Sequence, residues 1–311
     1  IKGATTRAET DSAIAGGTEN DGTKNIQLNL NGEKWINDNW KFKSTLYSRK
    51  TKSDYDGSSS SEEGYISDNR MYVFQNSLDH KSKKSDDAFV FHYHNYDREY
   101  ENIDGTSVLD EYDSESFVVK GERKIIPTNK KFSFGYGSEY KYDWGNFENR
   151  GNYAASTKGH MKNLGFFGNA GYKINENSIL SLHGRSDDHN TTGRNQTYKL
   201  NFTQFLGKFK LAVTHSTGLR NPTLYELYGT DNSGIGGNIN LDAEKSRTNE
   251  LFVKYNLSDA LSFVSTAYRT TIFDRIESNA AYSRHENELI ALNQEGLENE
   301  LFYKGNNQSL S

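Results

Sequence analysis

A single stretch, Lys131–Gly145, constrains the fold more than any other part of the chain. It reads KFSFGYGSEYKYDWG, and every even position from Phe132 to Trp144 except Ser138 is aromatic, whereas the odd positions are small, polar or charged. Successive side chains of a β-strand point to opposite faces, so the pattern predicts one long strand with an aromatic face and a polar face. At about 3.3 Å per residue and a tilt near 45°, such a strand rises about 30 Å, the thickness of a bilayer's hydrocarbon core. We therefore predict a membrane-spanning strand, with a long hairpin of a soluble β-protein as the alternative.

The composition favours strands over helices as the elements that cross the membrane. Hydrophobic residues make up 33% of the 311 residues, and no apolar run approaches the roughly 18 residues that a transmembrane helix requires. A barrel strand needs only every second residue to face lipid. The 20 Tyr and 17 Phe suit the aromatic girdles of such a barrel. The absence of Cys excludes disulfides and thiolate chemistry, and a net charge of −5 offers no basic patch for nucleic acid.

The same alternation repeats along the chain and predicts about thirteen antiparallel strands in an all-β fold. Short turns such as 37–39 and 175–177 alternate with long polar loops such as 50–70 and 101–114. The other segments predicted as loops are 1–22, 146–159, about thirty residues after Val213, and 274–292. Short turns at one end and long loops at the other are typical of transmembrane barrels. Because an odd number of strands with two open edges cannot close in lipid, we expect the chain to be the middle of a larger barrel.

The most specific motif follows the strand that ends near Val213. Residues 215–229 read HSTGLRNPTLYELYG, and residues 237–250 read GNINLDAEKSRTNE. This ordered pair resembles the barrel signature of TonB-dependent outer-membrane receptors, with Leu219 in place of the usual aromatic residue and Ala243 in place of the usual proline. The positions that match the signature are Arg220, Pro222, Glu226, Leu227, Tyr228, Gly237, Asn238, Leu241 and Glu244. From the resemblance we expect Arg220, Glu226 and Glu244 to pair inside a polar lumen, and the alternative is an ordinary long loop with a proline turn.

A second motif, Arg185-Ser186-Asp187-Asp188, also resembles this family, in which a strand ends in Arg-x-Asp-Asp before a glycine-containing loop. By parity Arg185 and Asp187 share a face that points away from the apolar Leu180 and Leu182. We therefore expect them to line the lumen as paired charges that hold the barrel wall.

The resemblance covers nearly the whole chain and implies both its architecture and its role. It implies that residues 1–311 are the central part of the barrel domain of a receptor with about 22 strands, without the plug domain and the closing strands. The implied function is the import of a scarce, large ligand across the outer membrane of a Gram-negative bacterium. TonB–ExbB–ExbD would supply energy through the plug and its TonB box, and outer-membrane lipid would surround the barrel. No catalytic residues are implied, because such a barrel performs no bond chemistry.

Acidic residues in two consecutive loops resemble the calcium ligands of the cobalamin (vitamin B12) transporters within this family. The residues concerned are Glu19 and Asp21 in one loop, followed by Tyr55, Asp56 and Asp68 in the next. Ca²⁺ takes about 6–8 hard oxygen ligands, which clustered carboxylates on adjacent loops supply. The resemblance therefore implies a calcium site and cobalamin as the ligand, and the alternative is a solvated acidic surface.

Three other functions remain open. A siderophore receptor would bind a ferric chelate through aromatic and basic loop residues, and a binding or adhesion barrel would only display its loops. A barrel-embedded hydrolase would need a Ser–His pair on one wall, and no such motif occurs. His92 and His94 share a face without an evident third metal ligand, so we expect them in the wall or lumen. Glu139 and Asp143 flank Lys141 on one face, which indicates a lumen charge ladder rather than acid–base catalysis.

Overall fold

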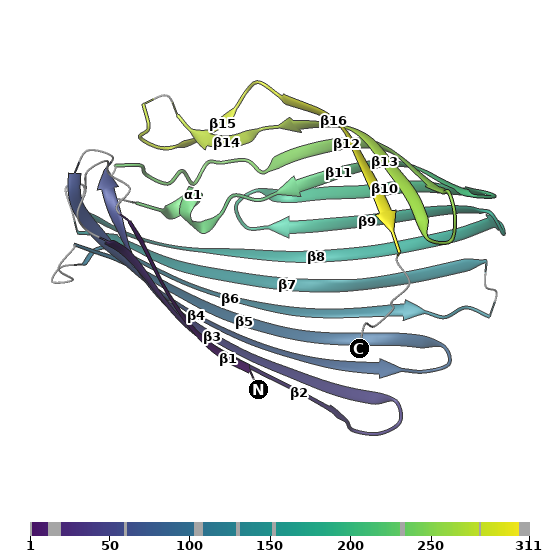
Figure 1. Cartoon of the computed structure of the whole chain (residues 1–311), viewed down its shortest axis with the longest axis horizontal. Coiled ribbons are helices and arrows are strands. Elements are labelled where there is room, and N and C mark those ends of the chain that lie inside the picture. Colours follow the sequence, from purple (N-terminus) through teal and green to yellow (C-terminus); the bar gives the residue numbers. More distant parts are fainter. Residues whose placement is uncertain are drawn as a thin grey trace.

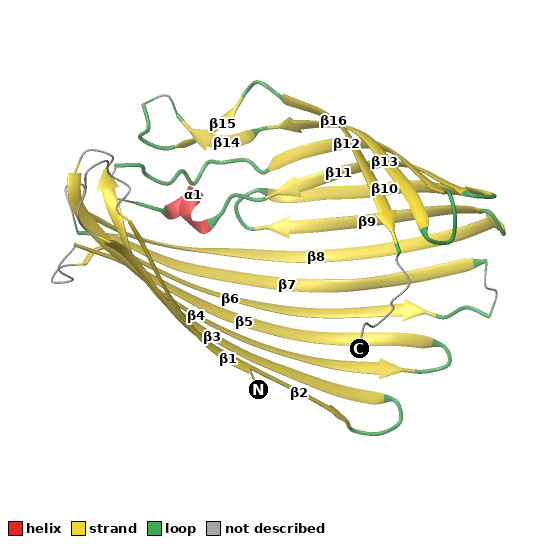
Figure 2. Cartoon of the chain, viewed as in Figure 1, coloured by secondary structure: helices red, strands yellow, loops and turns green. Residues whose placement is uncertain are grey.

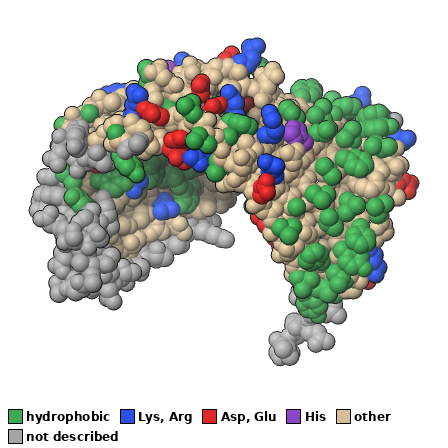
Figure 3. Space-filling view, turned by 90° about the horizontal axis from the view of Figure 1, so that it is seen from above, with side chains coloured by type: hydrophobic (Ala, Val, Ile, Leu, Met, Phe, Trp, Pro, Cys, Tyr) green, Lys and Arg blue, Asp and Glu red, His purple; other side chains and the backbone are tan. Residues whose placement is uncertain are grey.

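The sheet dominates the structure, a computed structural model that describes residues 2–11, 20–58, 61–102, 108–128, 131–150, 154–230, 234–279 and 281–304. Fourteen strands form one antiparallel sheet, in which strands adjacent in sequence pair with each other and β13 pairs with β16. The sheet is strongly curved (Figure 1), and the space-filling view shows that its concave side is hollow (Figure 3). Figure 2 shows that strands make up almost all of the described chain, together with one short helix, α1.

The elements have the following bounds. They are β1 (Lys2–Asp11), β2 (Asn20–Trp35), β3 (Trp40–Ser58), β4 (Ser61–Lys81), β5 (Ser85–Asn102), β6 (Val108–Ile125), β7 (Phe132–Asn149), β8 (Ala155–Asn175), β9 (Ser178–His189), β10 (Gly193–Leu206), β11 (Phe209–Arg220), α1 (Leu224–Tyr228), β12 (Glu244–Asn256), β13 (Leu261–Phe273), β14 (Arg275–Ser278), β15 (His285–Glu288) and β16 (Leu292–Tyr303). At one end of the sheet, the short-turn end, connections of two to six residues join the strands; at the other, the loop end, the connections after β3 and β9 are equally short, whereas those after β11 and β13 are long. The expected alternation of short turns with long loops is therefore wrong for β3–β4 and β9–β10, because the strands themselves extend into the segments predicted as loops. No helix in the described part of the chain is long and apolar enough to cross a membrane.

Several segments predicted as loops are strands in the structure. Residues 1–22 contain β1, which pairs with β2, and most of 50–70 extends the ladder between β3 and β4. The segment 274–292 contains the small hairpin of β14 and β15. The apolar alternation ends before these extensions begin, because both of their faces are polar. A polarity pattern therefore detects only the part of each strand that has one apolar face.

The two faces of the sheet differ in the way that the alternation predicted. Register places the even positions of β7, among them Phe132, Phe134 and Tyr136, on the same face as Leu164 and Phe166 of β8. Large apolar side chains on this outward face are exposed, and Figure 3 shows them gathered over the outer surface of one wall. The opposite, lumen face carries polar and charged side chains. The outward face is therefore the surface that would meet lipid.

Neighbouring strands are staggered, so a row of directly paired residues changes height as it crosses the sheet. One such row, here called the lumen row, consists of Lys81, Asp86, Lys124, Gly135, Asn169, His183, Lys199, Ser216, Thr248, Thr270 and Gln294. Lys81 ends β4 at the short-turn end, whereas Gln294 lies near the start of β16 at the loop end. This stagger is the shear that a tilted barrel wall requires.

A charge on the outward face is expected to destabilise the inserted barrel, whereas the same charge on the lumen face is tolerated. Phe166 is 59% exposed within the outward apolar face of β8. The substitution Phe166→Arg should destabilise the inserted barrel by about 2–3 kcal/mol, because arginine loses hydration in lipid. Asn169→Arg, on the lumen face of the same strand, is the matched control. Heat-modifiable gel migration of the membrane fraction measures the folded population, and equal losses for both variants would contradict the assignment of faces.

Candidate functional site

The connection between β11 and β12 folds back against the lumen face at the loop end. Its helix α1 begins at Thr223, whose side chain accepts a hydrogen bond from the Glu226 amide, while the Glu226 carboxylate accepts one from the Thr223 amide. This reciprocal capping box allows a helix of only five residues to form at a fixed place. Leu227 is 1% exposed, and the helix lies against β7 and β8. We call residues 221–243 the mouth segment.

An ion-pair triad closes the base of the mouth segment. Arg220 donates through Nε and Nη2 to both oxygens of Glu244, at 2.5 and 2.7 Å, and through Nη1 to Glu226 at 3.0 Å. The Ile276 amide also donates to Glu244 at 2.8 Å. The sequence motif therefore brings together the three charges that we expected to pair. The triad ties the ends of β11 and β12, α1 and β14 into one unit.

The triad makes the mouth segment sensitive to acid. Hydrogen bonding from Arg220 lowers the pKa of Glu244 below its ordinary value of 4.5, although partial burial opposes this shift. Arg220 and Glu244 are the terminal residues of β11 and β12, beyond the outward apolar face. A group with a depressed folded-state pKa stabilises the fold above its unfolded pKa and loses that contribution as pH falls through the folded pKa.

We therefore expect local opening of the mouth segment to increase once the pH falls below about 4.5. The measurement is hydrogen exchange of the amides of Ile276 and Gly237 as a function of pH, after correction for the intrinsic exchange rate. The two conditions to compare are about pH 6 and about pH 3, which lie on either side of the ordinary carboxylate pKa. Equal protection of these amides at both would contradict this expectation.

A small hydrophobic core and the hairpin of β14 and β15 hold the mouth segment from the other side. The core consists of Met161, Leu227, Leu241 and Ile276, with Leu224 and Tyr228 packed against it. Asn287 donates to the carbonyl of Asp242 at 3.1 Å and to that of Asp274 at 2.7 Å, and Asn238 donates to the His285 carbonyl at 2.9 Å. Two connections far apart in sequence thus form one packed body within the loop end.

Aromatic side chains converge beside this body. The ring of Tyr112 lies 5.9 Å from Tyr100, 5.8 Å from Phe147 and 5.9 Å from Tyr225, measured between centroids. Tyr225 also approaches His285 at 6.0 Å. Tyr100, Tyr112 and Phe147 come from β5, β6 and β7, so three strands and α1 contribute to what we call the aromatic mouth. The guanidinium of Arg98 lies 4.4 Å from the Tyr100 ring centroid, which places a cation at its edge.

Farther along the lumen, a charged cluster joins three strands. Arg185 donates to Asp187 at 2.7 Å and to Glu139 at 2.9 Å, and Asn163 donates to Asp187 at 2.6 Å. A Cβ on Gly165 would collide with the guanidinium of Arg185 and the carboxylate of Asp187, so a larger residue there would force these side chains to shift. Asp187 is buried, whereas Asp188 is exposed on the outward face, where the register places it opposite Arg194 of β10. The cluster binds strand to strand and has the character of a wall element rather than of a reaction centre.

Three small residues of β7, Ser133, Gly135 and Gly137, face the lumen near the short-turn end, as the alternation predicts. Their size alone would suggest that they leave space inside the barrel. A Cβ on Gly135 would instead lie 2.4 Å from Asn169, and a Cβ on Gly137 would lie 2.5 Å from the Phe167 ring. The space beside these glycines is therefore filled by side chains of the neighbouring strand β8. The sequence of β7 alone could not predict this packing.

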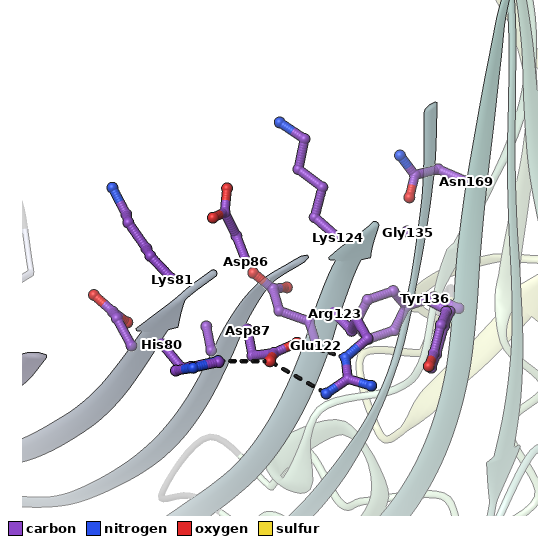
Figure 4. A pocket seen from close by; sticks show the side chains of 13 residues that line it. His80, Lys81, Asp86, Asp87, Glu122, Arg123, Lys124, Gly135, Tyr136 and Asn169 are labelled. Atoms are coloured by element: carbon purple, nitrogen blue, oxygen red, sulfur yellow. Dashed lines mark hydrogen bonds and ion pairs between the residues drawn. The ribbon is translucent and has the colours of Figure 1, made fainter. Parts of the chain in front are cut away.

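A cavity of about 360 Å³ lies at the short-turn end, where β4, β5, β6, β7 and β8 meet. In Figure 4, Lys81 and Lys124 extend into it on the lumen side. On the other side of the sheet, His80 Nδ1 lies 3.0 Å from Asp87, and Arg123 donates to Asp87 at 2.6 Å. The cavity is lined by side chains of both charges, among them Lys81, Asp86 and Lys124.

The five residues that resemble calcium ligands are only partly described. Glu19 lies outside the described residues, Asp21 lies in β2, Tyr55 and Asp56 lie in β3, and Asp68 lies in β4. Asp68 is 5% exposed and forms two ion pairs, one with Lys50 at 2.9 Å and one with Arg70 at 3.5 Å. Among the residues searched in the described chain, no three His, Asp or Glu side chains form a group that could hold a metal ion.

The residues of the aromatic mouth were missed by sequence reasoning. Tyr100 and Tyr112 fall in 101–114 or at its border, and Phe147 falls in 146–159, both of which were predicted as loops. The signal that could have found them is parity, since Tyr96, Arg98 and Tyr100 continue the lumen face of His92 and His94 beyond the apolar alternation. Their convergence on Tyr225 depends on how the mouth segment folds and has no local signal.

The family described as "TonB dependent receptor-like, beta-barrel" matches residues 3–288. A search of curated proteins finds no match. Among solved structures, the chain is similar to the siderophore receptor PirA from Acinetobacter baumannii, at 16% identity and a TM-score of 0.74, over 96% of this chain and 54% of that one. It is also similar to the copper transporter OprC, at 12% identity and a TM-score of 0.77, over 98% of this chain and 54% of that one.

A third similar structure is the hemophore receptor HasR of Serratia marcescens, solved in complex with its hemophore HasA and heme. The identity is 13% and the TM-score 0.69, over 92% of this chain and 52% of that one. The chain thus spans about half the length of these structures. Their identities are low enough that the likeness concerns the fold alone.

Proposed function

Because the chain belongs to the family of TonB-dependent receptor β-barrels, we propose that it forms part of the wall of an importer that takes up a ferric chelate of the siderophore class. Members of this family are transporters of the Gram-negative outer membrane and not enzymes. The outward apolar face agrees with a place in lipid, and the polar lumen face agrees with an interior that remains hydrated.

The observation that carries the choice of ligand class is the aromatic mouth. The half-buried rings of Tyr100, Tyr112 and Tyr225 pack edge to face in one cluster around Tyr112, with Phe147 as a buried member at 5% exposed, and Arg98 adds a cation at its edge. A ferric chelate is a bulky, often anionic and often aromatic molecule, which such a surface binds by stacking and by charge. Siderophore receptors named among the similar structures support this class. The copper transporter and the hemophore receptor show that one fold is used for different ligands.

Cobalamin with calcium is the second candidate. Its support is the backbone arrangement that places Asp21, Asp56 and Asp68 on three adjacent strands at the loop end. The described side chains weigh against it, because Asp68 already has Lys50 and Arg70 as cationic partners. In this alternative Ca²⁺ would displace those partners and order the loops before cobalamin binds.

In the proposed mechanism the chain captures the ligand and lines the path along which it passes. The aromatic mouth binds the chelate from outside, and the lumen row offers polar contacts along the wall. TonB with ExbB and ExbD would deliver energy to an inner plug domain, whose movement opens the path. The charged cluster of Arg185, Glu139 and Asp187 keeps the wall closed and rigid during that movement, since its ion pairs lie within the wall itself.

The test measures binding and uptake separately in cells that produce the protein. A panel of ferric siderophores and cobalamin is offered with and without EGTA, which removes calcium. We expect one ferric chelate to bind independently of EGTA and to enter only when TonB is present. Binding of cobalamin that is abolished by EGTA would favour the second candidate, and binding without any TonB-dependent uptake would favour an adhesion barrel.

The aromatic mouth is tested by Tyr112→Leu, with the outward-facing Tyr140→Leu as the matched control. Loss of one central stacking ring should weaken binding of the chelate about tenfold, corresponding to roughly 1.4 kcal/mol. An unchanged dissociation constant in Tyr112→Leu would show that the ligand binds elsewhere.

A further inference from the structure

Two carboxyl groups lie side by side on the outward face at the loop end. Register places Asp97 of β5 directly opposite Asp113 of β6, and both residues are half-buried. We call them the carboxyl pair. Two outward positions nearer the short-turn end, Tyr93 and Phe117 lie opposite each other in the aromatic part of the wall. The carboxyl pair therefore lies beyond the part of the outward face that meets lipid, where the extended strands are surrounded by water.

The two carboxyl groups form a hydrogen bond with each other, which requires one of them to carry a proton. Asn95 donates to one oxygen of Asp97 at 2.9 Å. Hydrogen bonding to Asp97 raises the pKa of Asp113 to about 7, and partial burial and the charges of Asp97, Glu111 and Glu115 act in the same direction. Asp113 is therefore the group that holds the shared proton.

The surroundings of the carboxyl pair favour retention of that proton. Arg70 of β4 is in direct register with Asp97, but its guanidinium also approaches Asp68 at 3.5 Å and Glu99 at 3.9 Å. On the other side, Asp113 lies opposite the neutral Asn146 of β7. The titratable groups that face the pair from the neighbouring positions are Asp68, Arg70 and Tyr72 on β4, Tyr93 and Glu99 on β5, Glu111 and Glu115 on β6, Glu148 and Arg150 on and after β7, and Lys158 on β8. Carboxylates outnumber cations in this set.

The same stretch of ladder carries the aromatic mouth on its lumen side. Arg98 pairs with Tyr112 one ladder position from the carboxyl pair, and Tyr112 pairs in turn with Phe147 of β7. Adjacent residues of a strand project to opposite faces of one backbone, so a change in the spacing of β5 and β6 at the pair also moves Arg98 and Tyr112. The backbone thus connects the carboxyl pair to the aromatic mouth.

We propose that the carboxyl pair is a pH-sensitive switch that holds the aromatic mouth together. With one shared proton it joins β5 to β6, and loss of the proton leaves two like charges directly opposite each other, which loosens the ladder. A group with a raised folded-state pKa stabilises the fold fully below its unfolded pKa and loses that contribution as pH rises through the folded value. The mouth is therefore assembled in mildly acidic surroundings and loosens as the pH rises to about 7 and beyond. The switch acts on the aromatic mouth, so its role in uptake rests on the proposed function.

The test follows hydrogen exchange in detergent-solubilised protein without any ligand, at about pH 5.5 and about pH 8, after correction for the intrinsic exchange rate. One proton changes local opening by at most about tenfold per pH unit, and partial exposure of the pair reduces the total to about tenfold. We expect this increase for residues 95–100 and 110–115, which form the ladder around the pair. Residues 132–140 of β7, in the lipid-facing wall, should not change.

Two variants separate the shared proton from the general charge of this face. Asp113→Asn keeps a donor toward Asp97 but has no proton to lose in this range, so exchange of the ladder should become independent of pH. Glu148→Gln is the matched control, because it removes one outward carboxylate of β7 and leaves the carboxyl pair intact. Heat-modifiable migration confirms that both variants remain folded. Equal exchange of the unmodified protein at both pH values would overturn the proposal, and so would an unchanged pH dependence in Asp113→Asn.

Binding of the ferric chelate selected by the uptake panel is measured separately at the same two pH values. Its dissociation constant should increase about threefold at the higher pH, as expected if about a third of the mouths remain assembled, and should increase less in Asp113→Asn. Comparison with this variant removes any effect of pH on the chelate itself. The same increase in both proteins would overturn the connection between the pair and the mouth. Absence of chelate binding at every pH, with the expected exchange profile, would overturn the proposed ligand class and support the switch.

Discussion

Replacing Arg220 with methionine is expected to release the mouth segment while leaving the barrel wall folded. Arg220 is the only cation among the described residues that meets both Glu226 and Glu244, whose side chains are each 15% exposed. Its removal leaves two carboxylates facing each other and deprives the capping glutamate of α1 of its partner. Breaking a fully buried pair costs about 3–5 kcal/mol, and the 42% exposure of Arg220 reduces this to about 2 kcal/mol.

The measurement is hydrogen exchange resolved by residue. A loss of about 2 kcal/mol corresponds to a roughly thirtyfold increase in local opening. The amides of Leu227, Gly237 and Asn238, which bond within the mouth segment, should lose protection, whereas those of β7 should not. Arg150→Met is the matched control, because Arg150 also bridges two glutamates, Glu111 and Glu148, at the loop end but outside the mouth segment.

The second large effect is expected from a single methyl group at Gly159. A Cβ at this position would lie 2.0 to 2.4 Å from three atoms of the Tyr228 ring, among them Cγ, which is fixed close to the backbone of α1. Rotation of the ring about its Cβ–Cγ bond leaves Cγ in place and does not relieve the contact, so Gly159→Ala should push α1 off β8. Overpacking of this kind typically costs about 1–3 kcal/mol, and we expect a value near the upper end.

Gly184→Ala is the matched control, because nothing lies within 4 Å of a Cβ built there. The double variant Gly159→Ala with Tyr228→Ala should recover much of the loss, because the colliding ring is absent. Protease sensitivity of the mouth segment in detergent-solubilised protein reports the displacement. A Gly159→Ala variant as resistant as Gly184→Ala would show that Tyr228 does not rest on β8 in the protein.

The wall could be predicted from the sequence because lipid and water impose opposite demands on alternate residues. In β7 the aromatic face of Phe132 to Trp144 and the polar face opposite have the orientation that parity predicted. The extensions of β3 and β4 could not be predicted in this way. There, residues such as Lys50, Lys52 and Asp68 are charged on the outward face too, so hydrogen bonding of the ladder continues without a change in polarity to reveal it.

The mouth could be predicted only in part. The Arg220–Glu226–Glu244 triad carried a family motif with defined spacing, and these charges do meet. The contacts of Tyr112 with Tyr225, or of Gly159 with Tyr228, join residues far apart in sequence. Such contacts depend on how one connection folds back over a curved sheet, which local pattern does not encode. The identity of the ligand is harder still to predict from the sequence, because it depends on the combined surface of several connections.

The staggered pairing has a consequence for anything that moves along the inside of this wall. The lumen row keeps a constant backbone register while it climbs from Lys81 at one end of the sheet to Gln294 at the other. Because the row is inclined to the barrel axis, a body that follows it rotates about that axis as it advances. Advance without rotation would require it to break contact with each strand in turn and to form new contacts at a different register. For a body that stays in contact with this row, the stagger of the wall couples translation to rotation.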